Sequence, residues 1–251
     1  MTEPHRPLAV VTGASSGIGL ALARQFSNHG FDLVVAARGP EIHAVAERLD
    51  AEGVEVDLAT PDGVRTLHQH LRHRPVTVLA LNAGITARSD DLERELELVD
   101  LNVRSLVHLA RLVTDEMRAR KRGRVLITAS IVEAFPGPHQ AAYNASKAFA
   151  RSFGISLRHE LREHGVSVTV LEPGATDTPI FEKADQETTI LGGAMPKDDP
   201  ADVAEQAFEA LMAGRETVVA ASITSKATHL VSRLLPDAVT ARVTGLLTKP
   251  R

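Results

Sequence analysis

Short apolar runs alternate with longer amphipathic runs along this chain. The apolar runs have the length and composition of buried strands, and they are Leu8–Val11, Leu33–Ala36, Val54–Val56, Val76–Leu81, Arg124–Ala129, Val166–Leu171 and Thr217–Ala220. The amphipathic runs have the spacing of helices, and they are Leu20–Asn28, Glu41–Asp50, Pro61–His70, Asp91–Arg120 and Gln140–His164. Strands that alternate with helices in this way predict an α/β fold with a doubly wound parallel sheet.

Length and patterning indicate a single domain over residues 1–251. With 251 residues, of which 43% are hydrophobic and 24% charged, the chain is long enough to bury one sizeable core. No internal repeat, low-complexity tract or linker divides it. The pattern weakens at 178–200, where Gly192 and Gly193 lie among residues of mixed polarity, and we expect a mobile connection there. A last amphipathic segment covers about 226–251.

Composition excludes several classes of function. Cysteine is absent, which excludes disulfides, zinc–thiolate sites and thiol catalysis. The formal net charge of −4 leaves no general basic field for nucleic acid, and the cations between Arg118 and Arg124 are typical of a helix end. The histidines at His68, His70 and His73 lie on a polar helix with no acidic partner in the pattern, so we expect no metal site. The polar start and the lack of a run of roughly 20 apolar residues predict a cytoplasmic protein.

A glycine-rich turn follows the first predicted strand. The segment Thr12-Gly13-Ala14-Ser15-Ser16-Gly17-Ile18-Gly19 joins that strand to the next predicted helix. Glycines allow a tight turn and a close approach to a pyrophosphate, and the free amides at a helix start attract the anion. The spacing departs from the common Gly-x-Gly-x-x-Gly, and a plain strand-to-helix connection is the alternative. The position after the first strand favours dinucleotide binding.

Tyr143 and Lys147 lie four residues apart on the predicted helix Gln140–His164, so their side chains share one helix face. An ammonium beside a phenol favours the phenolate, and we expect it to lower the pKa of the tyrosine from its ordinary value of about 10. A pair tuned in this way is a candidate general acid or base. When these two residues are considered alone, a chance pair on a helix face is the alternative.

Several motifs, taken in register, resemble those of the classical branch of the short-chain dehydrogenase/reductase family. They are Thr12-Gly-x-x-x-Gly-x-Gly19, Asn82-Ala83-Gly84, Asn102, Ser130, Tyr143-x-x-x-Lys147 and Pro173-Gly174, and the resemblance covers about residues 7–220. It implies a Rossmann-type sheet, a nicotinamide dinucleotide cofactor, and hydride transfer between that cofactor and a carbonyl or alcohol. Leu81 departs from the family pattern, because a second asparagine is usual there.

The resemblance also assigns the catalytic roles. Tyr143 would protonate the carbonyl oxygen during reduction, or remove the hydroxyl proton in the reverse reaction. Lys147 would lower the pKa of this phenol and hydrogen-bond the nicotinamide ribose. Ser130 would fix the carbonyl, and Asn102 would hold a water that connects Lys147 to solvent. Because the cofactor carries the hydride, the protein needs to supply orientation, a hydrogen-bond donor and a proton source.

For the cofactor, the resemblance implies contacts from the glycine turn and from the ends of later strands. These residues are Gly13, Ser15, Ser16, Gly17, Ile18, Gly19, Arg38, Asp57, Leu58, Asn82, Ala83, Gly84, Tyr143, Lys147, Pro173, Gly174 and Thr178. Arg38 follows the second strand, where an acidic residue would accept from a ribose 2′-hydroxyl and an arginine can hold a 2′-phosphate. We therefore favour NADP(H) over NAD(H), although Ser16 stands where NADP-preferring relatives often carry a basic residue. The alternative for Arg38 is a solvated surface charge.

The substrate side is less determined. By analogy with relatives the pocket residues are Val132, Gln140, Ile180, Phe181 and Met195, a mostly apolar set that indicates a medium-sized hydrophobic carbonyl compound. Ordinary core is the alternative for such residues. Glu133 stands three residues past Ser130, where relatives often have glycine, and we expect its carboxylate to point outward. The resemblance makes the connection at 178–200 a substrate lid.

The predicted helix Asp91–Arg120 carries more apolar positions than one sheet-facing stripe needs. In the family this helix and the catalytic helix commonly form a four-helix bundle between subunits, so the resemblance implies a homodimer or homotetramer. Cover by the chain's own C-terminal segment is the alternative. We expect the segment at 226–251 to cap the pocket or to lie at a subunit interface, and we rank contact with a membrane surface below both.

The sequence therefore predicts an NADP(H)-dependent enzyme that interconverts a carbonyl and a secondary alcohol of a small molecule. One alternative is an NAD(H)-dependent alcohol dehydrogenase of the same family. Others are a dinucleotide-binding regulator without turnover, and an enzyme that epimerises or dehydrates sugar nucleotides with a retained cofactor. The presence of all four catalytic-type residues disfavours the regulator, and the glycine spacing disfavours the sugar-nucleotide enzyme.

Overall fold

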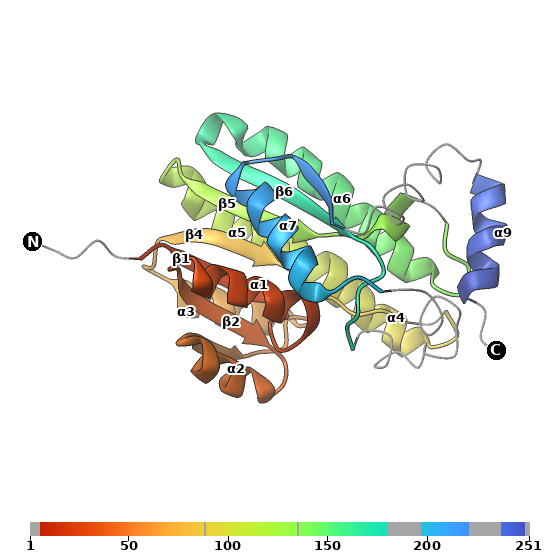
Figure 1. The fold of residues 1–251 in the computed structure, drawn as a ribbon, viewed down its shortest axis with the longest axis horizontal. Helices are drawn as coiled ribbons and strands as arrows, with labels where there is room; N and C mark the ends of the chain where they lie inside the picture. Colours follow the sequence, from red (N-terminus) through yellow and green to blue (C-terminus); the bar gives the residue numbers. More distant parts are fainter. Residues whose placement is uncertain (1–5, 88, 135, 180–196, 221–236, 249–251) are drawn as a thin grey trace, which may run out of the picture.

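A parallel seven-stranded sheet forms the centre of the molecule (Figure 1). The structure is a computed structural model that describes residues 6–87, 89–134, 136–179, 197–220 and 237–248. Its strands are β1 Leu8–Thr12, β2 Asp32–Ala37, β3 Glu52–Glu55, β4 Val76–Leu81, β5 Gly123–Thr128, β6 Val166–Pro173 and β7 Thr217–Ala220. They lie in the order β3-β2-β1-β4-β5-β6-β7, and every neighbouring pair is parallel. The strand order reverses between β1 and β4, and their carboxyl ends therefore open a crevice at this edge.

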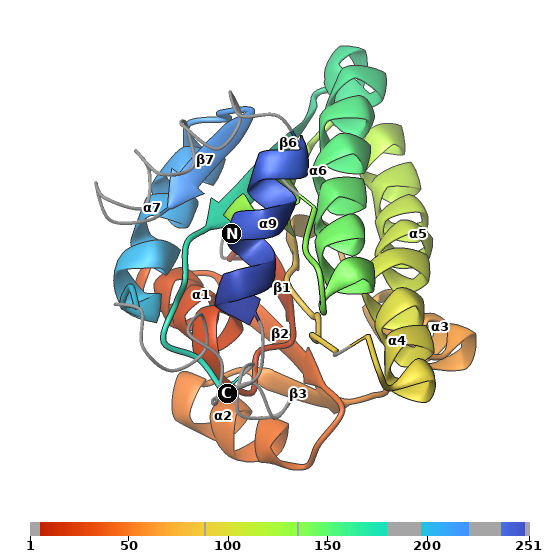
Figure 2. The same cartoon turned by 90° about the vertical axis from the view of Figure 1, so that its right-hand side faces the viewer.

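Helices cover both faces of the sheet (Figure 2). They are α1 Gly17–Asn28, α2 Glu41–Leu49, α3 Pro61–Leu71, α4 Leu92–Val99, α5 Leu106–Ala119, α6 Ala141–Leu161, α7 Pro200–Met212 and α9 Asp237–Thr248. One core lies between the sheet and α3, α5 and α6, and the other lies between the sheet and α1, α2 and α7. Alternate residues of each strand enter opposite cores, as Val10 and Val11 of β1 do. Strands buried on both faces explain the continuous apolar runs in the sequence.

The predicted doubly wound parallel sheet is confirmed, and each predicted strand is found with small shifts at its ends. The predicted helix Asp91–Arg120 consists of α4 and α5 joined by a π-helical turn, Asp100–Ser105. A π-helical turn inserts one residue into the helical repeat, and such turns are frequent at functional sites. The prediction of one continuous helix followed from a stretch that is rich in apolar residues and contains no glycine or proline.

Helix α7 is absent from the sequence prediction. Asp199 accepts a hydrogen bond from the amide of Ala201 at 2.8 Å, and Pro200 occupies the first helical position. An Asp-Pro pair is a recognisable start signal for a helix, so the signal was present in the sequence. Val203, Ala207 and Leu211 then place one face of α7 in the core against α1.

Helix α9 lies beyond the carboxyl ends of the strands (Figure 2). A Cβ on its Gly245 would be 3.4 Å from Pro138, in the loop that precedes α6. Thr240 and Thr244 of α9 are buried. The helix is therefore positioned over the loop that leads into the catalytic-type helix. Most of the predicted lid and the start of the C-terminal segment, at 180–196 and 221–236, lie outside the described residues.

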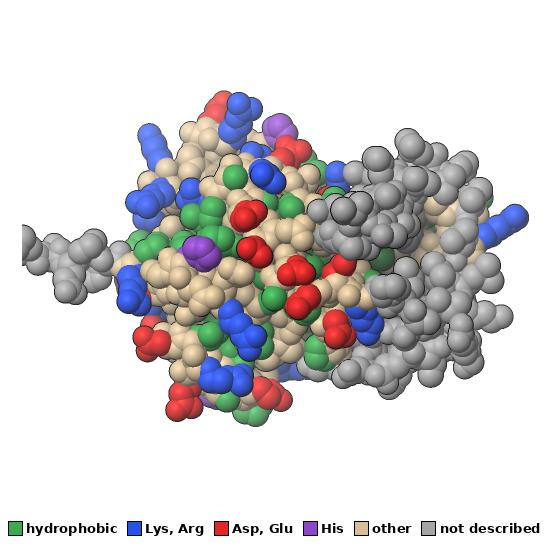
Figure 3. Space-filling model, viewed as in Figure 1, with side chains coloured by type: hydrophobic (Ala, Val, Ile, Leu, Met, Phe, Trp, Pro, Cys, Tyr) green, Lys and Arg blue, Asp and Glu red, His purple; other side chains and the backbone are tan. Residues whose placement is uncertain are grey.

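Charged side chains of both signs are interspersed on the face drawn in Figure 3, with acidic ones over α7. Two histidines expected to be solvated have acidic partners instead. His68 Nε2 lies 3.0 Å from Glu116 Oε1, and His70 Nε2 lies 3.1 Å from Glu52 Oε2. These partners come from other elements, so their proximity could not be read from the helix pattern. Over the described ranges no helix is long and apolar enough to cross a membrane.

Candidate active site

The end of β1 is tied to the end of β4 by one threonine. Thr12 Oγ1 accepts hydrogen bonds from the amides of Asn82 and Ala83, both at 3.1 Å, and donates to the carbonyl of Ala80 at 3.3 Å. The side chain of Asn82 donates to the carbonyl of Thr12 and accepts from Thr128 Oγ1, which ends β5. Three strand ends are thus held together at the crevice. The predicted Asn82-Ala83-Gly84 segment lies here, while the importance of Thr12 in ordering it was missed.

The glycine turn lies against this network. Gly13 has a positive φ of 67°, which side chains rarely adopt, and its amide donates to the carbonyl of Ala36 at 2.8 Å. A Cβ on Gly19 would lie 2.1 Å from the carbonyl oxygen of Gly13, so helix α1 can approach the turn only because residue 19 is glycine. A Cβ on Gly17 would lie 2.8 Å from Thr178 Cγ2, which places Thr178 directly beside the turn.

The first turn of α1 has the properties of an anion site. Ser16 is its N-cap residue, and among the described residues no side chain caps this end. The first amides of a helix have no partner within the helix and carry the positive end of its dipole. With Ser15, Ser16 and Ile18 at the turn and no acidic residue in the first turn, the backbone fits a pyrophosphate. The residues present therefore fit a dinucleotide cofactor.

Tyr143 and Ser130 meet where α6 faces the end of β5. Their side chains are hydrogen-bonded to each other. Ser130 is 8% exposed and Tyr143 is partly buried. Burial raises the pKa of Tyr143 to about 12, and the hydrogen bond with Ser130 lowers it only in part. The phenol is protonated at neutral pH, which is the form that donates a proton.

The predicted lowering of the tyrosine pKa by Lys147 is wrong in this structure. Lys147 Nζ lies 5.8 Å from the centre of the Tyr143 ring and donates a hydrogen bond to the carbonyl of Thr128 at 3.1 Å. Burial lowers the pKa of Lys147 itself to about 8. The two residues share a helix face, as predicted, but burial sets the direction of the pKa shift of each. Helical spacing carries no information about this burial.

Asn102 lies within the π-helical turn and joins it to the crevice. Its Oδ1 accepts from the amide of Ile85 at 3.0 Å, and its Nδ2 donates to the carbonyl of Ile85 at 2.9 Å. Nδ2 also lies 3.1 Å from Ser146 Oγ on α6. A Cβ on Gly84 would lie 3.2 Å from Asn102 Oδ1 and 3.4 Å from Lys147 Nζ. The structure therefore brings Asn102, Gly84 and Lys147 together, although they are far apart in sequence.

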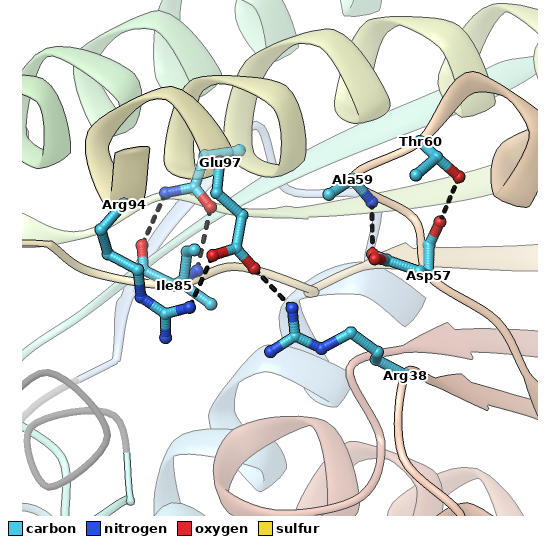
Figure 4. Close-up of polar contacts among 8 residues, drawn as sticks. Arg38, Asp57, Ala59, Thr60, Ile85, Arg94 and Glu97 are labelled. Carbon is cyan, nitrogen blue, oxygen red and sulfur yellow. Dashed lines mark hydrogen bonds and ion pairs between the residues drawn. The ribbon is translucent and has the colours of Figure 1, made fainter. Parts of the chain in front are cut away.

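The other predicted cofactor residues lie along the same edge of the sheet. Asp57 follows β3, and its Oδ1 accepts from the amide of Ala59 at 2.9 Å, which orients the carboxylate (Figure 4). Leu58 is buried and lines a small cavity that Lys147 also lines. Pro173 ends β6, and the amide of Gly174 donates to the carbonyl of Ala220.

Arg38 follows β2 but is not a free surface charge. It is paired with Glu97 of α4, and Glu97 is also paired with Arg94 (Figure 4). Sequence reasoning missed the pairing of Arg38 with Glu97, because the two residues lie 59 positions apart in the chain. The i to i+3 spacing of Arg94 and Glu97 was the only part of this cluster visible in the sequence.

On the substrate side, Gln140 is buried at the start of α6 and Val132 is partly buried beyond β5. The carbonyl of Val132 accepts from Asn144 Nδ2 at 3.1 Å. The other pocket candidates, Ile180, Phe181 and Met195, lie outside the described residues.

The prediction that Glu133 points outward is wrong. Its side chain is 7% exposed, and its Oε1 lies 3.5 Å from Arg151 Nε of α6. The same nitrogen donates to Glu172 Oε1 of β6 at 2.9 Å. The charge of Arg151 accounts for the inward position, since a carboxylate is stabilised next to a guanidinium in a dry setting. Within the described ranges no group of three or more histidine and acidic residues could hold a metal ion.

Known proteins resemble this chain in sequence. The family model described as short chain dehydrogenase matches residues 7–189. An uncharacterized oxidoreductase of Staphylococcus saprophyticus is 31% identical over 224 residues, which cover 84% of this chain and 93% of that protein.

Solved structures resemble the whole fold. A short-chain dehydrogenase from Sphingobium yanoikuyae in complex with NADPH has a TM-score of 0.81 and 26% identity, and the match covers 98% of this chain and 96% of that one. A 3-ketoacyl-(acyl-carrier-protein) reductase from Brucella melitensis complexed with NADH has a TM-score of 0.77 and 25% identity, with 88% and 99% of the chains covered. These neighbours include proteins with either reduced dinucleotide bound.

Proposed function

Because this chain belongs to the short-chain dehydrogenase/reductase family, we propose that it transfers hydride between NADP(H) and a carbonyl or secondary alcohol. Membership makes it an oxidoreductase that uses a nicotinamide dinucleotide. The observation that carries the finer proposal is that Tyr143, Ser130 and Lys147 lie together at the end of β5, on the same edge of the sheet as the glycine turn.

In the proposed reduction, Tyr143 donates its proton to the carbonyl oxygen as negative charge develops there. Burial keeps the phenol protonated at neutral pH, and the nearby Ser130 hydroxyl gives a second hydrogen-bond donor for the same oxygen. When bound, the nicotinamide supplies the hydride in this direction and accepts it in the other.

Lys147 and Asn102 have supporting roles in the proposed site. The Lys147 ammonium is held by the carbonyl of Thr128, and with a pKa of about 8 it is mostly charged at neutral pH. It is therefore placed to bind a ribose hydroxyl of the cofactor. Asn102 holds the crevice backbone through Ile85 and brings its amide near Lys147.

The proposed preference for NADP(H) depends on Arg38. A guanidinium can make a bidentate, charge-assisted contact with a phosphate, whereas no acidic residue ends β2 to accept from a free 2′-hydroxyl. The NADPH-bound relative supports this choice, and the NADH-bound relative shows that the fold accepts either dinucleotide.

Substitution of the proton donor tests the proposal. We expect Tyr143→Phe to lower kcat/KM by about 10³-fold or more, because a positioned general acid contributes about 10²–10⁴-fold and the hydroxyl also binds the carbonyl. The Kd for NADPH should change by less than about threefold, since the other cofactor contacts remain. Turnover is measured as loss of NADPH absorbance with a panel of ketones, aldehydes and quinones, and Kd by fluorescence titration.

Several outcomes would contradict the proposal. Unchanged turnover in Tyr143→Phe would remove Tyr143 from its role. NADPH binding by the native protein without turnover of any panel compound would support a regulator. A nucleotide that copurifies with the protein and is not consumed would support sugar-nucleotide chemistry.

A further inference from the structure

The guanidinium of Arg38, which we assign to the cofactor 2′-phosphate, is paired with the carboxylate of Glu97. Arg38 Nη1 donates to Glu97 Oε1 at 2.5 Å, and Arg94 Nη1 donates to Glu97 Oε2 at 2.5 Å. Figure 4 shows the Glu97 carboxylate between the two guanidiniums, with Asp57 farther to the right. Each oxygen of Glu97 therefore serves a different arginine.

The pair joins two walls of the dinucleotide crevice. Arg38 extends from the end of β2, and Glu97 lies on α4, which follows β4 through the Asn82-Ala83-Gly84 segment. Asp57, at the end of β3, lies beyond Arg38 in the same view (Figure 4). A ribose bound at the end of β2 would carry its 2′-substituent close to Arg38. Glu97 consequently lies near the place where the two cofactors differ.

The two halves of the cluster differ in how firmly they are held. The Arg38 side chain is 57% exposed, whereas those of Glu97 and Arg94 are 25% and 29% exposed. An ion pair with so exposed a partner is weak and is easily exchanged for another anion. Arg94 lies three residues from Glu97 on the same helix, so it retains the carboxylate when Arg38 turns away. Arg38 is thus the movable member.

Glu97 is negatively charged at neutral pH. Burial raises the pKa of Glu97, but the hydrogen bonds from Arg38 and Arg94 outweigh this effect and hold the pKa below its ordinary value of 4.5. A charged carboxylate beside Arg38 both competes for the guanidinium and repels an approaching phosphate. NADH lacks the 2′-phosphate and does not require the pair to open.

We propose that Glu97 is a specificity-determining residue, which competes with the 2′-phosphate of NADPH for Arg38 and so limits the preference for NADPH over NADH. This inference rests on the proposed function, in particular on the assignment of Arg38 to the 2′-phosphate. Arg94 is the positioning residue, because its guanidinium stays paired with Glu97 after Arg38 has moved to the phosphate. The cluster of two guanidiniums and one carboxylate carries one net positive charge, and the substitution Glu97→Gln raises this to two.

The test compares cofactor affinities in the substrate-free protein. We expect Glu97→Gln to lower the Kd for NADPH by about tenfold, because the ion pair no longer has to be broken and one like charge is removed. The Kd for NADH should change by less than about twofold, and high salt should reduce the NADPH effect. Kd is measured by fluorescence titration of each reduced nucleotide, which needs no turnover.

Glu93→Gln is the matched control. Glu93 is exposed on the first turn of α4 and is paired with none of the described residues, so its removal changes the charge of the same helix without freeing Arg38. It should leave both Kd values within about twofold of the native ones, since exposed charges are screened. Glu97→Asp, which keeps the charge on a shorter side chain, gives a second variant should Glu97→Gln fold poorly, and it should tighten NADPH binding less than Glu97→Gln.

The variant Arg38→Met separates the proposal on Glu97 from the assignment of Arg38 to the 2′-phosphate. In Arg38→Met, Glu97→Gln should no longer tighten NADPH binding by freeing a guanidinium, so most of the tenfold effect should disappear. If native protein prefers NADPH and Arg38→Met loses that preference, but Glu97→Gln leaves NADPH affinity unchanged or weakens it, the competitive role of Glu97 is overturned alone. If native protein does not prefer NADPH, or if Arg38→Met does not alter the preference, the proposed cofactor assignment is overturned together with it.

Discussion

The phenol of Tyr143 can be observed without interference, because the chain has one tyrosine and no tryptophan. It is also the residue where sequence spacing and tertiary surroundings disagree most. The spacing to Lys147 predicts a lowered pKa, whereas burial raises the pKa to about 12. The two effects have opposite signs, so a titration distinguishes them.

We expect tyrosinate absorbance in the folded protein to appear with a midpoint near 12. Protein unfolded in guanidinium should titrate near ~10. Because the folded state holds the proton to higher pH, this phenol leaves stability unaffected below about pH 10 and lowers it as pH rises from about 10 to 12, by up to ~1.4 kcal/mol per pH unit.

Two variants identify the cause of the shift. Ser130→Ala should raise the midpoint further, because the hydrogen bond with Ser130 lowers the pKa. Lys147→Met should change it little, since the amine of Lys147, with a pKa of about 8, is uncharged at the pH where the phenol titrates. A native midpoint below 10 that rises in Lys147→Met would show that the ammonium dominates, as the spacing predicts.

Helix α1 packs directly against the glycine turn that precedes it. The close approach of Gly19 to the Gly13 carbonyl lets the free amides of α1 point into the crevice. Asn82 Nδ2 also lies within 2.6 Å of where a Cβ on Gly19 would be, so the strand ends share this contact.

We expect Gly19→Ala to lower the free energy of unfolding by about 1–3 kcal/mol, because a methyl group would overlap backbone that is fixed by β1. Helix propensity alone predicts a gain of ~1 kcal/mol, so the sign of the change is diagnostic. The variant should also bind NADPH more weakly, since the helix start must shift. Urea denaturation and NADPH titration provide the two measurements.

Gly245→Ala is the matched helical control. A Cβ there would lie 3.4 Å from Pro138, which is ordinary contact, and this change should be neutral or slightly stabilising. Equal effects from the two alanine variants would show that the approach of α1 to the turn is not steric in origin.

At the scale of the whole molecule, the helical layer that contains α4 and α6 has exposed apolar side chains. Leu92, Leu96 and Val99 of α4 are 66%, 51% and 42% exposed, and Phe149 of α6 is 38% exposed. The neighbouring Phe149 and Phe153 rings stack at 5.9 Å. Exposed apolar side chains gathered on one layer indicate a protein contact, and a second copy of this chain is the proposed partner.

We expect native protein to be a dimer or tetramer and the double variant Leu96→Glu, Val99→Glu to be a monomer, because two charges per subunit would be buried without partners. Size-exclusion chromatography with light scattering measures the mass. Met212→Glu is the control, since Met212 is 37% exposed on α7 in the opposite layer. An oligomer that survives the double variant, or is lost in the control, would place the interface elsewhere.

The sequence was most informative about strands and helices and about the proposed catalytic groups that lie in motifs. Buried parallel strands require continuous apolar runs, and the glycine turn and the Tyr143–Lys147 spacing are local in the chain, so each leaves a local signal. Helix α7 also had a start signal at Asp199 and Pro200, which was overlooked. The break between α4 and α5 had no such signal, because no glycine or proline interrupts Asp91–Arg120.

The sequence alone predicted the alternation of strands and helices, the glycine turn proposed to bind phosphate and the proposed proton-donor pair, because these depend on residues that are neighbours in the chain. Only the tertiary structure decided the charge environments. The Glu97 partner of Arg38, the inward position of Glu133 beside Arg151, and the raised pKa of Tyr143 all arise between distant segments. Electrostatic energies depend on distance in space and on burial, and neither quantity is written in the spacing of residues along the chain.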